Sequence, residues 1–220
     1  MPKVKKHDFI EVDYIGRIKI SNQIFDLTNE ELAKENKLYH KNTRYGPVVI
    51  CIGEAHILKE LDLNLEGKEI GKEYIIDIPS EKAFGKKDPR LMRIVNSNIF
   101  KKQEIMPIPG LQVSIDGLMG IIRSVSSGRC IVDFNHPLAG RDLVYEIKIN
   151  KIIEDIEEKI KCLINFNLLL NEKDFGIEII ENKTKISLKE DIPEELQNIL
   201  KEKIKELVKD IKDIEIIKEI

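Results

Sequence analysis

The chain of 220 residues has the length of one large domain or two small ones. Charged residues make up 34% and apolar residues 42%, enough for a sizeable core, and no stretch approaches the roughly 20 apolar residues of a membrane span. The net charge of −3 argues against a nucleic-acid binder. The N-terminus lacks the apolar region of a secretory signal, and three isolated cysteines predict a reduced, cytoplasmic protein.

The first half predicts short strands and one helix. Residues 9–20 alternate apolar and polar side chains, which predicts a half-buried strand with a bend or bulge at Gly16. Two further strands are predicted at residues 47–53 and 72–79. Between them, residues 54–67 place isoleucine and leucine at helical spacing and end at a glycine, a favoured helix C-cap.

The pattern changes near residue 86 and again near residue 152. In the region 86–133 prolines interrupt the chain, and three short strands are predicted at 111–117, 118–125 and 129–134. A strand predicted at 143–149 then alternates apolar and polar side chains, as the strands of the first half do. The remainder predicts a helix, a hairpin, an amphipathic helix that begins at Pro193, and a final strand, which is an α-β-β-α-β order.

Motifs of nucleophilic and metal-dependent enzymes are absent from the sequence, which has no GxSxG, P-loop or HExxH pattern. His56 and Glu60 are four residues apart on the predicted helix, a weak metal signal whose alternative is a solvent-side pair that supports the helix. His136, between Asn135 and Pro137, is interpreted as a turn residue. We expect neither a metal site nor a cofactor.

Aromatic residues form the remaining candidate site. Tyr14, Phe25, Phe84 and Tyr145 lie on four segments, each where a strand or turn would face the core of the first half. Ile57, at the start of the predicted helix, belongs to the element that would fill the sheet. The pattern alone leaves two interpretations open, a packed core and an open apolar cleft.

Five motifs in fixed order, "VDYIGRI", "FD", "IGEAHILKELDLNLEGKEIGKEY", "EKAFG" and "NHPLAGRDLVYEI", resemble the FKBP-type peptidyl-prolyl cis-trans isomerases, specifically the SlyD-like branch, over roughly residues 4–151. The resemblance implies an α+β fold in which an antiparallel half-barrel surrounds a short helix. It implies an isomerase domain formed by residues 1–85 and 134–152, and an insert-in-flap chaperone domain at 86–133. Residues 153–220 then form a C-terminal α+β domain.

The resemblance also implies rotamase activity in an apolar prolyl pocket. The implied catalytic residues are Tyr14, Asp26, Phe84 and Tyr145, and the implied substrate-binding residues are Phe25, Ile57, Leu58, Leu61 and Leu138. Ile57 would offer its backbone N–H to the substrate. Relatives frequently have tyrosine at the position of Phe84, tryptophan at that of Leu61 and an aromatic residue at that of Val48. These differences predict an altered affinity for peptides and for macrolide inhibitors. For Asp26 the alternative is a purely structural role, holding a neighbouring side chain or backbone.

The insert implies a second activity, the binding of unfolded or proline-containing polypeptides. Its predicted client-binding residues are apolar side chains that such a small unit cannot all bury, namely Met92, Ile94, Ile99, Met106 and Ile108. Alternatively, these side chains pack inside the insert or against the barrel. The competing function is a holdase or binding module with little catalytic activity. Homodimerisation through the C-terminal domain is a further hypothesis.

Overall fold

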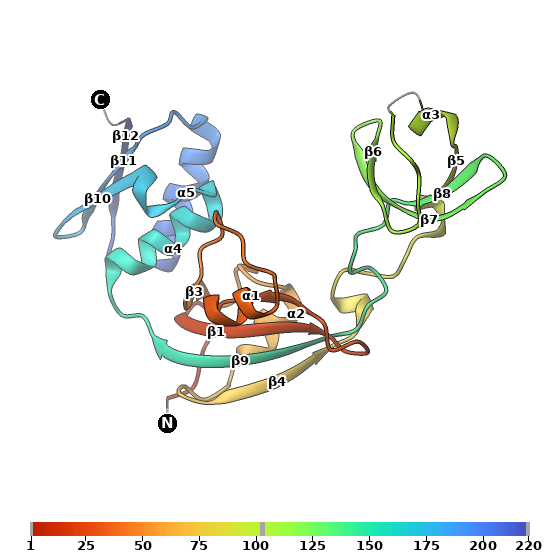
Figure 1. The fold of residues 1–220 in the computed structure, drawn as a ribbon. Coiled ribbons are helices and arrows are strands. Elements are labelled where there is room, and N and C mark those ends of the chain that lie inside the picture. Colours follow the sequence, from red (N-terminus) through yellow and green to blue (C-terminus); the bar gives the residue numbers. More distant parts are fainter. Residues whose placement is uncertain (1, 102–103, 219–220) are drawn as a thin grey trace. The chain divides into compact units, whose positions relative to one another are not determined.

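The computed structural model describes residues 2–101 and 104–218 (Figure 1). The chain divides into two compact units, one formed by residues 1–77 and 144–220 and the other by residues 78–143. No helix within the described ranges is both long and apolar enough to cross a membrane. The architecture is α+β, with antiparallel strand pairs and few helices.

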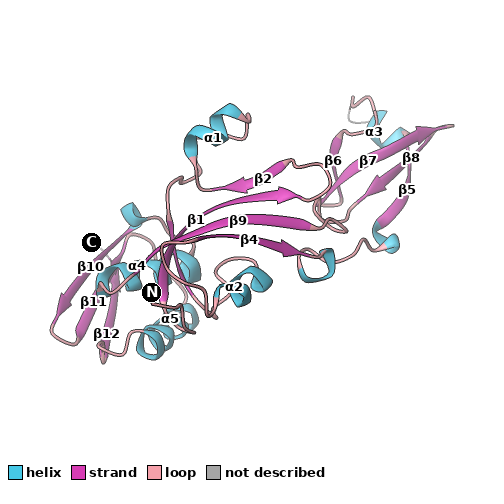
Figure 2. Ribbon diagram, turned by 90° about the horizontal axis from the view of Figure 1, so that it is seen from below, coloured by secondary structure: helices cyan, strands magenta, loops and turns pink. Residues whose placement is uncertain are grey.

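A five-stranded sheet is the main element of the larger unit (Figure 2). Its strands are β1 (Phe9–Ile18), β2 (Ile24–Leu27), β3 (Val48–Cys51), β4 (Glu73–Ile78) and β9 (Leu143–Ile152). They follow the order β2-β1-β9-β4, and β3 also pairs with β1. Four of these strands coincide with predicted ones to within a few residues, because their alternation places one row of side chains in the core.

A register shift between Gly16 and Arg17 interrupts the pairing of β1 with β2. The sequence predicted a bend or bulge at this glycine, and the structure confirms it. The two ends of β1 pair with different strands, residues 9–12 with β3 and residues 15–17 with β2. The bulge therefore lies in the half of β1 that pairs with β2.

The loop before α2 differs from the prediction. Helix α1 spans Glu30–Glu35, and α2 spans Lys59–Leu65 rather than beginning near residue 54. Gly53 and Ala55 instead adopt left-handed conformations, with φ of 92° and 54°. Their N–H groups donate to the buried carboxylate of Asp62, at 2.9–3.0 Å. Because the carboxylate binds these N–H groups, the chain forms a loop where apolar spacing alone predicted a first helical turn.

The C-terminal part of the same unit contains two helices and a three-stranded sheet. Its elements, in chain order, are α4 (Ile156–Leu168), η3 (Glu172–Asp174), β10 (Phe175–Ile180), β11 (Lys183–Leu188), α5 (Glu194–Leu207) and β12 (Asp213–Lys218). The strand order is β10-β11-β12, with β12 parallel to β11. Its core continues into the main sheet, since Phe9 and Cys51 belong to the same buried cluster as Leu163 and Ile204.

The second unit contains a four-stranded antiparallel sheet, in the order β5-β8-β7-β6. Its regular elements are η1 (Ser80–Lys82), η2 (Pro89–Leu91), β5 (Met92–Asn96), α3 (Asn98–Lys101), β6 (Gln112–Ile115), β7 (Leu118–Ser126) and β8 (Arg129–Asp133). Three strands were predicted, whereas β5 was missed because it directly follows the proline-containing turn at residues 89–91. The core consists of Phe100, Val113, Ile122, Cys130 and Val132.

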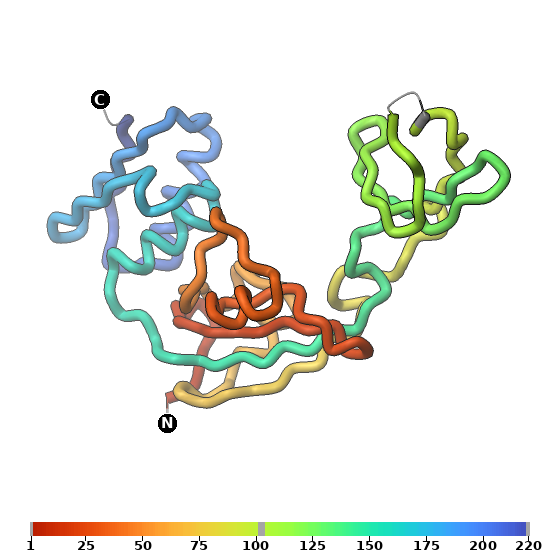
Figure 3. The backbone as a smooth tube through the Cα atoms, viewed as in Figure 1, coloured from red at the N-terminus to blue at the C-terminus, as the bar shows by residue number. Residues whose placement is uncertain are grey.

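Two adjacent segments lead into and out of this four-stranded sheet (Figure 3). The side-chain amide of Asn135 joins them, because it accepts from the Asp88 N–H at 2.8 Å and donates to the Asp88 carbonyl at 3.1 Å. Beside it the buried carboxylate of Asp133 accepts from Lys87 and Arg123 at 2.8 and 3.0 Å. The Asn135 backbone and side chain also donate to this carboxylate, which is therefore fully partnered.

Candidate functional site

Three of the four predicted aromatic residues meet in the larger unit. The ring of Tyr145, on β9, lies 5.9 Å from that of Tyr14, on β1, and 5.8 Å from that of Phe25, on β2, measured between centroids. The Phe25 and Tyr145 rings meet edge to face at 88°, an arrangement that aromatic pairs favour. We call Tyr14, Phe25 and Tyr145 the aromatic cluster. It forms where β2, β1 and β9 lie side by side.

Gly16 allows the rings of this cluster to approach the backbone. A Cβ atom at this position would lie 2.8 Å from the Phe25 ζ carbon and 3.0 Å from a Tyr145 ε carbon. Both distances are shorter than ordinary contacts, so any side chain here must displace a ring. The sequence predicted the bulge at Gly16 but not this packing role, which depends on residues 9 and 129 positions further along the chain.

We expect Gly16→Ala to destabilise the larger unit by about 1–3 kcal/mol, the usual cost of overpacking a filled site. Urea unfolding measured by far-ultraviolet circular dichroism gives this value directly. The variant Gly16→Ala/Phe25→Leu should recover part of the loss, because leucine lacks the ring atoms that collide. An unchanged free energy of unfolding for Gly16→Ala would show that the rings are not packed against this glycine.

Asp26 contacts the aromatic cluster through Tyr14, whose hydroxyl donates to the carboxylate at 3.2 Å. Although part of Asp26 is exposed, burial of its carboxylate raises the pKa of Asp26 above its ordinary value. Burial, and then the charge of Asp26, raise the pKa of Tyr14. Tyr14 is therefore a protonated donor at neutral pH, and the contact favours the interpretation that Asp26 orients a neighbouring side chain.

Ile57 and Leu58 are half-buried in the loop before α2, whereas Leu61 has no exposed surface. Leu61, predicted as the pocket floor, is thus covered by its neighbours. Within the described residues, no group accepts a hydrogen bond from the Ile57 N–H. This N–H is consequently available to a ligand that carries a carbonyl oxygen.

Phe84 and Leu138 belong to the second unit, whereas the residues of the aromatic cluster belong to the first. The Phe84 ring is partly exposed and stacks on His136, with centroids 4.3 Å apart and planes within 4°. The Leu138 N–H donates to Nδ1 of His136 at 3.2 Å. His136 thus contacts both segments of this unit, which agrees with its interpretation as a turn residue.

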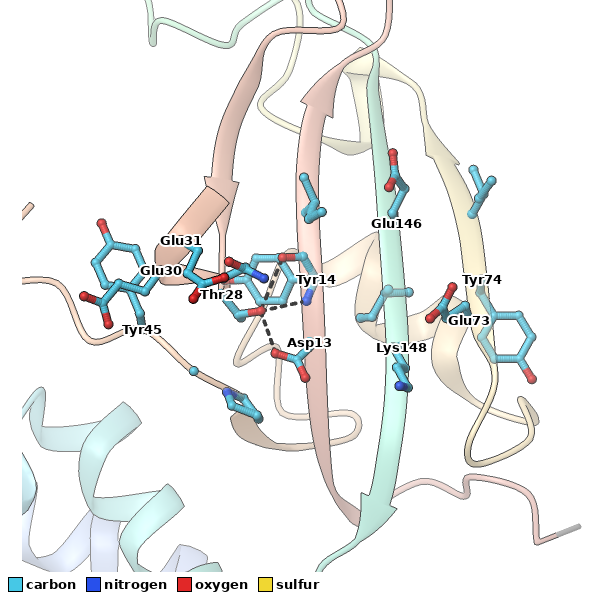
Figure 4. A pocket seen from close by; sticks show the side chains of 16 residues that line it. Asp13, Tyr14, Thr28, Glu30, Glu31, Tyr45, Glu73, Tyr74, Glu146 and Lys148 are labelled. Atoms are coloured by element: carbon cyan, nitrogen blue, oxygen red, sulfur yellow. Dashed lines mark hydrogen bonds between the residues drawn. The ribbon is translucent and has the colours of Figure 1, made fainter. Parts of the chain in front are cut away.

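A cavity of about 810 Å³ lies on another face of the main sheet (Figure 4). Side chains alternate along a strand, so Ile15 and Glu146 point to the face opposite Tyr145. The cavity is bounded by strands β1, β4 and β9 and by residues 28–31 and 45–47. Its walls carry several carboxylates, among them those of Asp13 and Glu73, beside apolar and aromatic residues that include Tyr14 and Ile75.

His56 is in the loop rather than on the helix, so the predicted helical pair with Glu60 is wrong. Its Nδ1 accepts from the Cys51 N–H at 3.1 Å, and its ring stacks on Phe166 of α4, with centroids 4.2 Å apart. Burial, and then the charge of Lys203, lower the pKa of His56 to about 4. Among the described residues, no three histidine, cysteine or acidic side chains are placed to hold a metal ion.

The buried His56 should make the folded protein less stable as the pH falls. Because the unfolded chain binds a proton near pH 6.5 and the folded one only near pH 4, the contribution of His56 is lost as pH falls through this window. The comparison is urea unfolding of the wild type and His56→Asn from pH 7 to pH 4.5. Both proteins have the same titratable and charged groups around position 56, namely Cys51, Cys162, Glu54 and Lys203. We expect the stability difference to shrink as pH falls, and a constant difference would contradict the assignment.

Two family descriptions match the chain. The family "FKBP-type peptidyl-prolyl cis-trans isomerase" matches residues 1–107, and "FKBP26, IF domain" matches residues 93–138. The first match includes Tyr14, Phe25 and Ile57, and the second covers most of the four-stranded sheet of the second unit. Four of the five motifs that carry the resemblance thus lie within matched segments, and the fifth, at residues 135–147, extends beyond them.

Curated relatives share the same description. A short-type peptidyl-prolyl cis-trans isomerase of Methanocaldococcus jannaschii is 32% identical over 149 residues, which is 68% of this chain and 94% of that protein. A probable FKBP-type 16 kDa peptidyl-prolyl cis-trans isomerase of Pseudomonas fluorescens is 27% identical over 47% of this chain and 71% of that protein. The isomerase SlyD of Escherichia coli strain K12 is 24% identical over 62% of this chain and 71% of that protein.

Proposed function

This chain belongs to the FKBP-type peptidyl-prolyl cis-trans isomerase family and is a rotamase by that membership, and we propose that it isomerises X–Pro bonds at the aromatic cluster. The observation that carries the proposal is the packing of the Tyr14, Phe25 and Tyr145 rings, and we assign to the same site the Ile57 N–H, which has no acceptor among the described residues. Phe84 and Leu138, in the second unit, stay sequence-based predictions of further site residues. The domain boundaries proposed are residues 1–85 with 134–152, 86–133 and 153–220.

An apolar site suits this reaction. Rotation about a peptide bond faces a barrier of about 18–20 kcal/mol, because amide conjugation is lost when the bond twists. Loss of conjugation also reduces the charge separation of the amide, so surroundings poor in water favour the twisted form over the planar one. Lowering the barrier by about 4 kcal/mol accelerates the reaction roughly 10³-fold. Apolar and aromatic side chains suffice for this step, because no bond is formed or broken.

The residues of the cluster have distinct roles in this proposal. The Ile57 N–H binds a substrate carbonyl and holds the peptide, while the Tyr14, Phe25 and Tyr145 rings enclose the proline. Asp26 holds the Tyr14 hydroxyl and so fixes the ring, which makes it a positioning residue rather than a group that handles protons. Leu58 borders the site, and the buried Leu61 supports it from beneath. The absent hydroxyl of Phe84 and the small side chains of Leu61 and Val48 predict looser binding of peptides.

The second unit binds unfolded client chains in this proposal. Supporting it, all five predicted client-binding residues are exposed, with Met106 at 81% and Ile94 at 69%. Ile94 and the exposed Ile131 are direct partners on β5 and β8, so they form a continuous apolar surface. Small apolar surfaces that contain methionine adapt to many partners. We expect the protein to act in the cytoplasm, without nucleic-acid or membrane partners, and homodimerisation through residues 153–220 is retained as a hypothesis.

NMR exchange spectroscopy of a short prolyl peptide tests the proposed site. We expect Tyr145→Ala to lower kcat/KM at least tenfold, since it opens the cluster to water and removes a packed ring. Tyr145→Phe should retain activity because the ring is preserved. The matched control is Ile75→Ala, which truncates an exposed side chain on the cavity face of the sheet.

Each outcome of this experiment has a definite meaning. Absence of acceleration by the wild type would favour the alternative function, a holdase with little catalysis. Acceleration that Tyr145→Ala leaves unchanged would place the active site elsewhere. A loss caused by Ile75→Ala but not by Tyr145→Ala would move the site to the cavity in Figure 4.

A further inference from the structure

Two helices of the C-terminal part contact the loop that carries Ile57. Phe166 of α4 stacks on His56 with an angle of 8° between the planes. The Cys162 thiol, one helical turn earlier, lies 3.6 Å from Nδ1 of His56 and donates to the Val49 carbonyl. From α5, the ammonium group of Lys203 pairs with the Glu54 carboxylate at 2.5 Å. Both of these helices thus contact residues 54–56.

This loop depends on side chains for its shape. Gly53 and Ala55 have positive φ, and for alanine this conformation is intrinsically unfavourable. Asp62 of α2 holds the loop from one side by accepting the N–H groups of these two residues. The C-terminal helices hold the other side, through His56 and Glu54. The loop is therefore fixed between the helix that follows it and a segment more than 100 residues away in the chain.

The orientation of the Ile57 N–H follows from the orientation of His56. The two residues share one peptide unit, which is planar, so the backbone conformation of His56 sets the direction of the N–H. The His56 ring is fixed at two points, by the Cys51 N–H on Nδ1 and by the face of Phe166. A displaced ring would rotate the peptide unit and aim the N–H away from the substrate.

We propose that Phe166 and Lys203 of the C-terminal domain, acting through His56 and Glu54, are positioning residues for the isomerase site. This inference rests on the proposed prolyl site, in which the Ile57 N–H binds the substrate. The C-terminal domain then completes the scaffold of the active site. It tunes substrate affinity from a distance, because its helices hold the loop without touching the peptide.

Phe166→Ala in the full-length protein tests this inference. An N–H that binds substrate and transition state equally affects KM rather than kcat, so we expect KM to rise about tenfold with kcat nearly unchanged. The backbone amide signal of Ile57 in NMR spectra should shift as well. Phe166→Tyr should retain wild-type values, because it keeps the stacked ring. Lys203→Met, which removes only the ion pair, should raise KM less.

Ile186→Ala is the matched control, since Ile186 is fully buried on β11 in the same core, and the ring and hydrogen-bond contacts described for His56 come from other elements. A purely structural loss reduces the fraction of folded enzyme and so lowers the apparent kcat, whereas KM stays constant. We expect this pattern for Ile186→Ala, together with an unshifted Ile57 amide. If Phe166→Ala behaves in the same way as this control, the inference is overturned.

The two proposals fail in different ways. If Tyr145→Ala abolishes activity while Phe166→Ala and Lys203→Met leave KM and the Ile57 amide unchanged, only the positioning role is wrong. If Tyr145→Ala leaves activity intact, the prolyl site itself is wrong. Should Phe166→Ala not fold, His56→Asn replaces it, because asparagine keeps an acceptor for the Cys51 N–H and loses the stacked ring.

Discussion

Replacing residues 86–133 with a short glycine-serine linker should lower catalysed refolding of a proline-limited protein about 100-fold, the usual scale of a tethering effect. In the proposed function, the insert holds the unfolded chain and so raises the local concentration of prolyl bonds at the aromatic cluster. Catalysis on a short peptide should remain nearly unchanged, because such a peptide does not need the second surface. The deletion is feasible because the Gly140 N–H donates to the Gly85 carbonyl at 2.7 Å, so the segments that flank the deleted residues lie side by side.

Substitutions on the exposed apolar surface of β5 and β8 test client binding without removing the whole insert. Ile94→Ser/Ile131→Ser changes two exposed neighbours and leaves the core of the second unit intact. It should lower refolding catalysis in the same direction as the deletion. Its control, Arg129→Ser, removes another exposed side chain of the same sheet. Equal refolding activity with and without residues 86–133 would exclude the proposed role of the insert.

Asp133→Ala should destabilise the second unit by roughly 2–3 kcal/mol. Loss of one partner of a buried ion pair typically costs about 3–5 kcal/mol, but Lys87 and Arg123 are partly exposed and regain water. The carboxylate is buried, which opposes its ionisation, yet hydrogen bonds from Lys87, Asn135 and Arg123 hold the pKa of Asp133 well below its usual range. Its stabilisation is therefore present at neutral pH and is lost only in strong acid.

Hydrogen exchange resolved by residue measures this effect separately in the two units. Amides of β5 to β8 should exchange faster in Asp133→Ala, whereas those of β1 and β9 should not change. The control is Glu81→Ala, which removes an exposed ion pair with Lys86 and should leave the exchange of these amides nearly unchanged. Equal protection of β5 to β8 in both variants would mean that the buried carboxylate contributes nothing.

Strands with one buried face were predictable from the sequence. Along residues 9–18 the even-numbered positions are mostly buried, whereas the odd-numbered ones apart from Phe9 are half-buried, and Tyr14 lies in the even-numbered row. The aromatic residues could be found individually, since each lies in such a pattern. Their contacts could not be derived, because Tyr14 and Tyr145 are 131 positions apart and only the order β2-β1-β9 brings them together.

Other features depended on side chains that periodicity ignores. The helix prediction began too early because the pattern of Ile57 and Leu61 is compatible with a helix, whereas Asp62 captures the N–H groups of the preceding loop. Asp133 pairs with Lys87 and His56 stacks on Phe166, both on distant segments, so neither role was visible in the sequence. The one signal in the sequence for the role of Asp133 was its place as an acidic residue inside the apolar strand "RCIVDF".

The most direct test of the proposed site is an NMR titration of the full-length protein with a short prolyl peptide. We predict that amide signals of Phe25, Ile57 and Tyr145, which are not among the residues that line the cavity, shift together and saturate with one affinity, equal to that obtained from the exchange kinetics. Shifts confined to the opposite face, at Ile15, Glu73 and Glu146 around the cavity in Figure 4, would contradict the account.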